Sequence, residues 1–172
     1  MMRIALGFRV HSGWAAVVAV SESREVLDRW RIEIADPKIP GSVQPYHAAQ
    51  PRKIAAASDY LRRCEESASR LALEALTALV AEVPGVTAAG VLVSSARPLP
   101  PLESILASHP LLHTAEGVHF REAVIRAAER LGLRVSRVVE RGVAVDPGLD
   151  AAGRALGPPW RQDQKLAATA AW

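Results

Sequence analysis

The chain has 172 residues, a formal net charge of +3 and a sequence pI near 9.5. Hydrophobic residues make up 49% and charged residues 23% of the sequence, a composition typical of globular proteins that argues against wholesale disorder. No apolar stretch approaches the roughly 20 residues needed to cross a bilayer, so we expect no membrane helix. With one cysteine, Cys64, the chain can form neither an internal disulfide nor a cysteine-based zinc site.

The excess of basic residues is small and spread along the chain. Lys and Arg number 21 against 18 for Asp and Glu, and most of the arginines are interleaved with glutamates. Such interleaving is typical of solvated helix faces, so charge alone does not predict a nucleic-acid surface. The N-terminal segment lacks the pattern of a secretion signal. We expect a single domain over residues 1–172, located in the cytoplasm.

The first third of the chain predicts a three-stranded antiparallel meander. Short apolar runs at 3–8 and 14–20 flank the segment RVHSG, and hydrophobic and polar residues alternate in RWRIEI at 29–34. Alternation with a period of two is typical of a strand with one buried face, and short polar connections join antiparallel neighbours. The Pro- and Gly-rich segment 36–50 has no clear period and is predicted to be a loop.

The remainder of the chain alternates helices with strands. Hydrophobic residues at helical spacing predict a long helix that Pro84 ends, and an amphipathic helix at 116–131 that Gly132 ends. A short helix is expected after Pro101. The other predicted elements are strands at 87–95 and 133–140, a linker at 141–160 and a C-terminal helix at 161–172.

The order of these elements predicts an α/β fold. Strands joined through helices lie parallel, whereas strands joined by tight turns lie antiparallel. Three strands in a meander, followed by helix, strand, helix, strand and helix, therefore predict a mixed sheet.

Three segments resemble the ribonuclease H-like superfamily, particularly its Holliday-junction resolvase and related bacterial branches. They are IALGFRVHSGWAAVV as the first hairpin, AAGVLVSS as the fourth strand and QDQKLAATAAW as the terminal helix. The resemblance implies a five-stranded sheet of order 3-2-1-4-5 with helices on both faces. It also implies a ligand crevice at the carboxyl ends of strands 1 and 4.

The resemblance further implies where metal-binding carboxylates would stand. In nuclease members, acids at the end of strand 1, at the end of strand 4 and in the last helix hold two divalent ions. The matching positions are Phe8 or Arg9, Ser94 or Ser95, and Asp163, so only the third is acidic. Because hard divalent cations need several oxygen ligands, we expect no metal, no cofactor and no two-metal cleavage of nucleic acid.

The implied crevice would carry positive charge and hydroxyl groups in place of acids. Guanidinium groups bind phosphate in bidentate fashion, and serine hydroxyls can complete the shell. We therefore predict a non-catalytic site for a phosphate-bearing ligand, either a nucleotide or a nucleic acid. Taken singly, the same side chains also suit turns and strand ends. The predicted residues are Arg9, His11, Ser12, Ser94, Ser95 and Arg97.

A second chemical signal lies in the segment SHPLLHTAEGVHFREA. It contains His109, His113, Glu116 and His119, whose side chains are of types that ligate zinc or act as general bases. Pro110 argues against His109 and His113 sharing a helical face, and the spacing matches no known metal motif. The favoured interpretation is a helix starting near Thr114, with Glu116 in its first turn and His119 on its exposed face.

Two classes of function remain open. The leading hypothesis is a non-catalytic binding or assembly module. A purely structural role, with self-association through an apolar patch such as the Trp-containing tail, would require neither ligand nor metal. The alternative is an enzyme, either a divergent nuclease or a hydrolase. Its candidate catalytic residues are Asp163, His113, Glu116 and His119, the last three belonging to the histidine cluster with His109.

Overall fold

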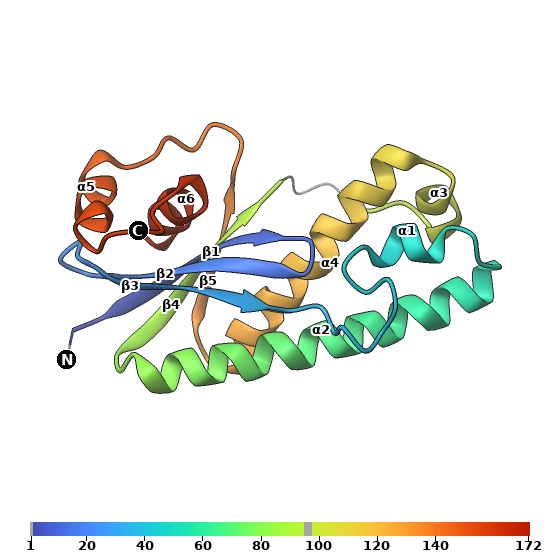
Figure 1. Cartoon of the computed structure of the whole chain (residues 1–172), viewed down its shortest axis with the longest axis horizontal. Helices are drawn as coiled ribbons and strands as arrows, with labels where there is room; N and C mark the ends of the chain where they lie inside the picture. The colour runs from blue at the N-terminus through green and yellow to red at the C-terminus, as the bar shows by residue number, and fades with distance from the viewer. Residues whose placement is uncertain (1, 95–97) are drawn as a thin grey trace.

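A mixed five-stranded sheet lies at the centre of the computed structural model, which describes residues 2–94 and 98–172 (Figure 1). The strand order is β3-β2-β1-β4-β5. β1 pairs antiparallel with β2 and parallel with β4, and β4 pairs parallel with β5. The strands are β1 (Ile4–His11), β2 (Trp14–Ser21), β3 (Val26–Glu33), β4 (Val86–Val93) and β5 (Arg134–Val139). The predicted fold class and strand order are confirmed.

Helices cover both faces of this sheet (Figure 1). The long α2 (Ile54–Glu82) and α4 (His109–Arg130) pack on one face, and α6 (Gln162–Ala171) packs on the other with α5 (Pro147–Ala155) beside it. Beyond the sheet, α2 and α4 also pack with the short α1 (Pro45–Ala49) and α3 (Leu102–Leu106). Within the described residues, no helix has the length and apolar character needed to cross a membrane.

The central strands bury side chains on both faces, which explains their nearly continuous apolar runs. Neighbouring residues of β4 illustrate the alternation: Val91 belongs to the core under α2 and α4, whereas Leu92 packs against α6. In the same way, Val17 of β2 lies in the first core and Val18 in the second. The sheet is therefore enclosed at its centre.

Two glycines allow α6 to lie directly on the sheet. A Cβ atom built on Gly7 of β1 would come within 1.7 Å of the carbonyl oxygen of Ala167, and one on Gly90 of β4 within 1.7 Å of the carbonyl oxygen of Ala170. These separations are far below van der Waals contact, so no other residue type fits either position without moving α6. The two contacts fix the height of α6 above β1 and β4.

Two segments predicted as irregular contain short helices. α1 lies within 36–50 and α5 within 141–160. Each has a proline in its first turn, where the missing N–H is not needed. α5 is also capped by Asp146, whose carboxylate accepts a hydrogen bond from the Leu149 N–H at 2.9 Å. The loop and linker predictions are wrong over these residues, because segments rich in glycine and proline can still form single short helices when a proline stands in the first turn.

The predicted start of α4 is also wrong. The helix begins at His109, with Ser108 as its N-cap residue, and Pro110 lies in its first turn. A proline in the first turn sacrifices no intrahelical hydrogen bond. Thr114 is therefore inside the helix, where its hydroxyl donates to the Pro110 carbonyl oxygen at 3.0 Å.

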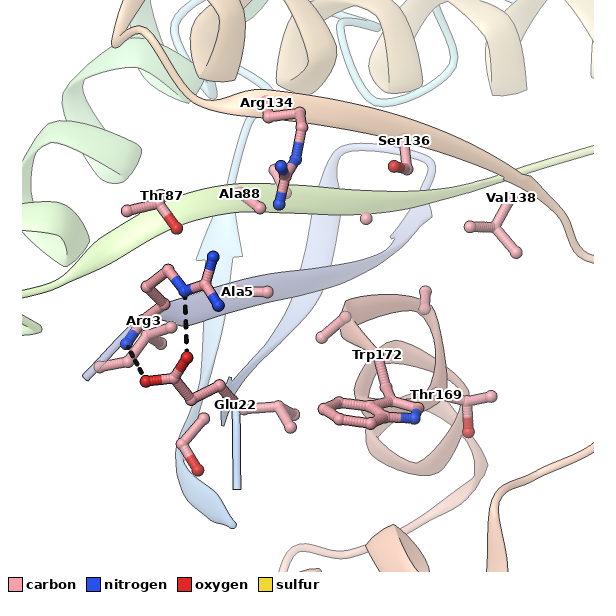
Figure 2. A pocket seen from close by; sticks show the side chains of 17 residues that line it. Arg3, Ala5, Glu22, Thr87, Ala88, Arg134, Ser136, Val138, Thr169 and Trp172 are labelled. Carbon is pink, nitrogen blue, oxygen red and sulfur yellow. Dashed lines mark hydrogen bonds and ion pairs between the residues drawn. The ribbon is translucent and has the colours of Figure 1, made fainter. Parts of the chain in front are cut away.

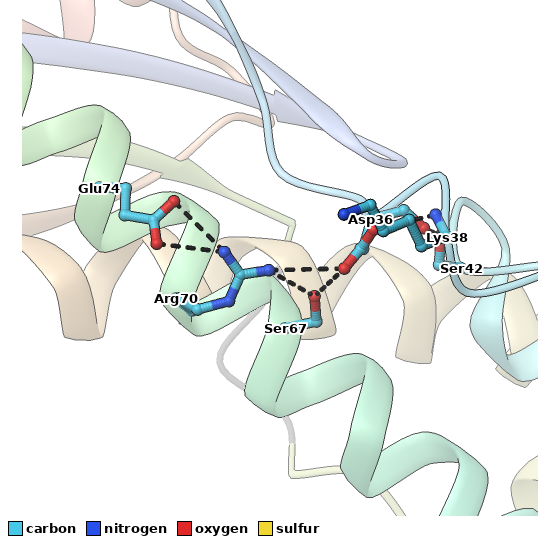
Figure 3. A network of polar contacts seen from close by, with 6 residues as sticks. All are labelled: Asp36, Lys38, Ser42, Ser67, Arg70 and Glu74. Carbon is cyan, nitrogen blue, oxygen red and sulfur yellow. Dashed lines mark hydrogen bonds and ion pairs between the residues drawn. The ribbon is translucent and has the colours of Figure 1, made fainter.

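A polar network ties the segment after β3 to α2 (Figure 3). The Asp36 carboxylate accepts hydrogen bonds from the Lys38 N–H at 2.9 Å and the Ser67 hydroxyl at 3.0 Å, and the Arg70 guanidinium lies 3.4 Å away. The hydrogen bonds from Lys38 and Ser67, with the charge of Arg70, hold the pKa of Asp36 below its ordinary value. The network positions the chain that leads into α1.

Candidate functional site

Arg9, near the end of β1, lies between two carboxylates from distant parts of the chain. Its Nη2 donates to Glu140 Oε1 at 2.6 Å and its Nε to the same oxygen at 3.0 Å. Its Nη1 donates to Asp163 Oδ1 at 2.7 Å. About a quarter of each of the three side chains is exposed, so the ion pairs are partly screened from water.

Regular secondary structure places both acids. The Glu140 N–H donates to the carbonyl oxygen of Val93 at 2.9 Å, which continues the β4–β5 ladder by one residue beyond β5. Asp163 lies in the first turn of α6, where the helix dipole favours a negative charge. The glycine contacts under α6 fix where that turn lies relative to β1.

His11 completes the group around Asp163. Its Nε2 lies 2.8 Å from Asp163 Oδ1, and its ring stacks on Trp14 with 4.4 Å between the ring centroids. Burial by itself raises the pKa of Asp163, but the hydrogen bonds and charges of His11 and Arg9 outweigh burial and hold that pKa below its ordinary value. Asp163 is therefore a carboxylate at neutral pH.

The other predicted ligand-binding residues lie in two places. Ser12 forms the β1–β2 turn with Gly13, and Ser94 is an exposed residue directly after β4. Ser95 and Arg97 lie outside the described residues. Arg9 and His11 face acids, so the positive charge predicted for this crevice is largely matched within the protein.

A cation that sequence reasoning missed lies beside Ser94. Arg121 of α4 donates from Nη1 to the Ser94 hydroxyl at 3.1 Å, and its buried Nε has no hydrogen-bond partner among the described residues. Burial lowers the pKa of Arg121, yet an arginine remains protonated at neutral pH. Ser94 and Arg121 line a cavity of about 170 Å³. In the same cavity Arg137 is paired with Glu122, whereas no described carboxylate lies within ion-pair distance of Arg121.

A larger hollow of about 550 Å³ opens beside the C-terminal end of α6 (Figure 2). Arg134 extends from β5 across β4, and the indole of Trp172 forms part of the opposite wall. Arg3 is hydrogen-bonded to Glu22 at 3.0 Å, whereas Arg134 has no ion-pair partner in the described part of the chain. The hollow is lined by the N-terminal parts of β1 and β4, at the strand ends opposite to Arg9.

The histidine segment is arranged differently from its prediction. His109 and His113 share one face of α4, with 3.1 Å between their Nε2 atoms. Glu116 is 1% exposed and accepts a hydrogen bond from the ring of His47 in α1 at 2.8 Å. His119 is buried, and burial lowers its pKa to about 4. The predicted places of Glu116 in the first helical turn and of His119 on the exposed face are wrong, because α4 starts earlier and α1 packs against it.

Comparisons with known proteins identify a likeness in structure alone. No protein-family model matches the chain, and no curated protein has a significantly similar sequence. Among solved structures, the fold is similar to that of T. thermophilus RuvC in complex with a Holliday junction substrate, with a TM-score of 0.54. The two chains are 12% identical, and the match covers 98% of this chain and 90% of RuvC. The fold is ribonuclease H-like.

The resemblance places an acid at Phe8 or Arg9, and of these two residues Arg9 is the one that pairs with Glu140 and Asp163. Its guanidinium supplies positive charge to both Asp163 and Glu140. Glu140 was not among the predicted site residues. Its position directly after β5, at the same sheet edge as the end of β4, was the available signal.

Proposed function

We propose that this chain binds nucleic acid and does not cleave it. The observation that carries the proposal is the guanidinium of Arg9 held between Glu140 and Asp163, where a nuclease would need its carboxylates free for divalent ions. The likeness to RuvC, whose solved structure holds a Holliday junction substrate, supports a polynucleotide as the class of ligand.

Arg121 and Ser94 are the proposed contacts to a backbone phosphate. A cavity of about 170 Å³ is smaller than the roughly 300–1,000 Å³ of pockets that enclose drug-sized molecules. The cavity suits one phosphate group better than a whole nucleotide. This favours a polynucleotide that places one backbone phosphate in the cavity and lies across the protein surface with its other groups. Arg9 is paired with Asp163 and Glu140, and His11 with Asp163, so Arg121 supplies the unmatched charge.

The first experiment measures the affinity of the full chain for a four-way DNA junction, a duplex and a single strand by fluorescence anisotropy at several salt concentrations. We expect binding that weakens with salt, because contacts to phosphates release counterions. Arg121→Ala should weaken binding at least about tenfold and reduce the salt slope by about 0.9, the value for one phosphate contact. Arg134→Ala removes the same charge from an exposed site elsewhere and should leave both values nearly unchanged.

The second experiment incubates the same DNA substrates with the chain and Mg²⁺ or Mn²⁺. We expect no cleavage. Metal-dependent cleavage that Asp163→Asn abolishes would establish the divergent nuclease instead. If a mononucleotide or orthophosphate binds and polynucleotides do not, the proposed ligand class is wrong, and a chain that binds none of them is not a nucleic-acid-binding protein.

A further inference from the structure

Three histidines from two helices converge at the end of the molecule where α1 meets α4 (Figure 1). His47 comes from α1, and His109 and His113 come from adjacent turns of α4. One ring nitrogen from each lies within 4.8 Å of the corresponding nitrogens of the other two. We propose that His47, His109 and His113 bind a transition-metal ion of the zinc class.

The spacing of the ring nitrogens fits such an ion. The Nε2 atoms of His109 and His113 are 3.1 Å apart. Two nitrogens bound to one tetrahedral zinc at about 2.0–2.1 Å are separated by roughly 3.3 Å, so this pair is almost at coordinating distance. The ring of His47 lies 4.7 Å from that of His113 and 5.3 Å from that of His109, measured between centroids. Small rotations of the exposed His109 and His113 rings would direct all three nitrogens at one ion.

Glu116 holds His47 in the orientation that binding requires. Its buried carboxylate accepts one hydrogen bond from His47 Nδ1 at 2.8 Å and another from the His47 N–H at 3.2 Å. With its proton on Nδ1, a neutral imidazole has a free electron pair on Nε2. A carboxylate behind a ligand histidine is the usual support in zinc sites, because it fixes the tautomer and raises the basicity of the ring.

The donor set selects the kind of metal. Three imidazole nitrogens suit zinc, copper and nickel, whereas magnesium and calcium require oxygen ligands. Three protein ligands leave a fourth position for water or an external group, as in zinc sites that remain open. His109 and His113 are exposed, so an ion can enter without local unfolding. A contact with Glu116 explains the position of His47 without any metal. It does not explain why the rings of His109 and His113 lie close to that of His47.

The test uses the full chain without a histidine tag, stripped by a chelator. Titration with Zn²⁺ against a chromophoric chelator should give one tightly bound ion per chain, and Zn²⁺ should raise the melting temperature. His113→Ala should weaken zinc binding by more than about 100-fold and abolish the thermal shift, because it removes a ligand from an exposed position. Glu116→Gln keeps a hydrogen-bond acceptor of the same shape and should cost about 10–100-fold, the range for such supporting carboxylates.

Thr114→Ala is the matched control, because Thr114 is exposed on the same helix and carries no metal ligand. It should bind zinc like the unaltered chain. Circular dichroism of each variant confirms that the helices are retained. If the stoichiometry stays well below one, or if His113→Ala binds zinc as tightly as the unaltered chain, the site does not exist. If Glu116→Gln has no effect on zinc affinity, the positioning role of Glu116 is refuted.

Discussion

Arg9 is the cation that pairs with both Glu140 and Asp163. Partly buried acids that lose their cation retain the cost of desolvation without the compensating attraction. The stability of the fold therefore depends on this one guanidinium. Whether the acids accept a metal ion can be tested by removing the guanidinium.

Arg9→Ala should lower the free energy of unfolding by about 2 kcal/mol, less than a fully buried pair would lose because these side chains are about a quarter exposed. Asp163 and Glu140 would then lack the guanidinium they share, so Mg²⁺ should raise the melting temperature of the variant more than that of the unaltered chain. Urea unfolding and thermal shift measure the two effects. Arg9→Lys keeps the positive charge but loses the planar guanidinium that contacts both acids. If Mg²⁺ raises the melting temperature of the unaltered chain, Arg9→Ala and Arg9→Lys equally, Arg9 does not keep metal ions from these acids.

His119 makes stability depend on pH through its burial. Its Nε2 has no hydrogen-bond partner among the described residues, and burial lowers its pKa from 6.5 to about 4. Between these values the unfolded chain binds a proton that the folded chain does not bind. Stability from this group is therefore lost as the pH falls below 6.5, and the loss is complete near pH 4.

Between pH 7 and pH 5, His119 should cost the folded chain about 2 kcal/mol. His119→Leu removes the titrating group and should flatten this part of the stability curve by the same amount. Urea unfolding at the two pH values measures the difference for each chain. If the free energy of unfolding depends on pH identically in the variant, folding does not lower the pKa of His119, and the folded chain is protonated there at pH 5.

Residues that act across long sequence distances were the least predictable. Arg9 and Asp163 are 154 positions apart, and His47 and Glu116 are 69 apart. Local pattern indicates which residues are buried or exposed on their own element, but it does not pair side chains from different elements. Asp163 was found because the resemblance names its place, whereas Glu140, Arg121 and His47 required the packing of helices on the sheet.

At the scale of elements, α6 is fixed by the backbone of β1 and β4. Gly90→Ala should lower the free energy of unfolding by at least about 3 kcal/mol, because the new methyl group would overlap the Ala170 carbonyl and displace α6. Gly132→Ala is the matched control. It has a positive φ of 73° and no atom near its Cβ position, so it should cost only about 1 kcal/mol of backbone strain. Equal costs in urea unfolding would refute direct helix–sheet contact.

Among the helices, the long α2 and the short α3 were predictable, whereas α1 and α5 were not. α2 follows from hydrophobic periodicity, and β1, β2 and β4 follow from apolar runs, because these elements bury side chains in the core. α1 has five residues, too few to be stable alone, and it is held by the burial of Pro45 and Ala49. α1 forms because it packs against α2 and α4, and the local sequence of α1 does not indicate that contact.

At the scale of the whole molecule, the helical end beyond the sheet has cores of its own. Tyr60, Leu61 and Cys64 pack with Ala49 in one cluster, and Ile105 packs with Leu112 in another. Neither cluster includes a residue of the sheet. In native-state hydrogen exchange we expect amides of α1 and α3 to exchange through a partial opening of lower free energy than that of β1 and β4. Equal free energies in both regions would show that the molecule opens only as one unit.

The placement of α6 on the first hairpin has a consequence for synthesis of the chain. At about 5–20 residues per second, roughly 8–30 s separate the translation of Arg9 from that of Asp163, which follows 154 positions later. Throughout that interval, the face of β2 that carries Val18 and Val20 lacks its final cover. A nascent chain therefore exposes an apolar sheet surface until α6 has left the ribosome, and it needs protection from aggregation during that time.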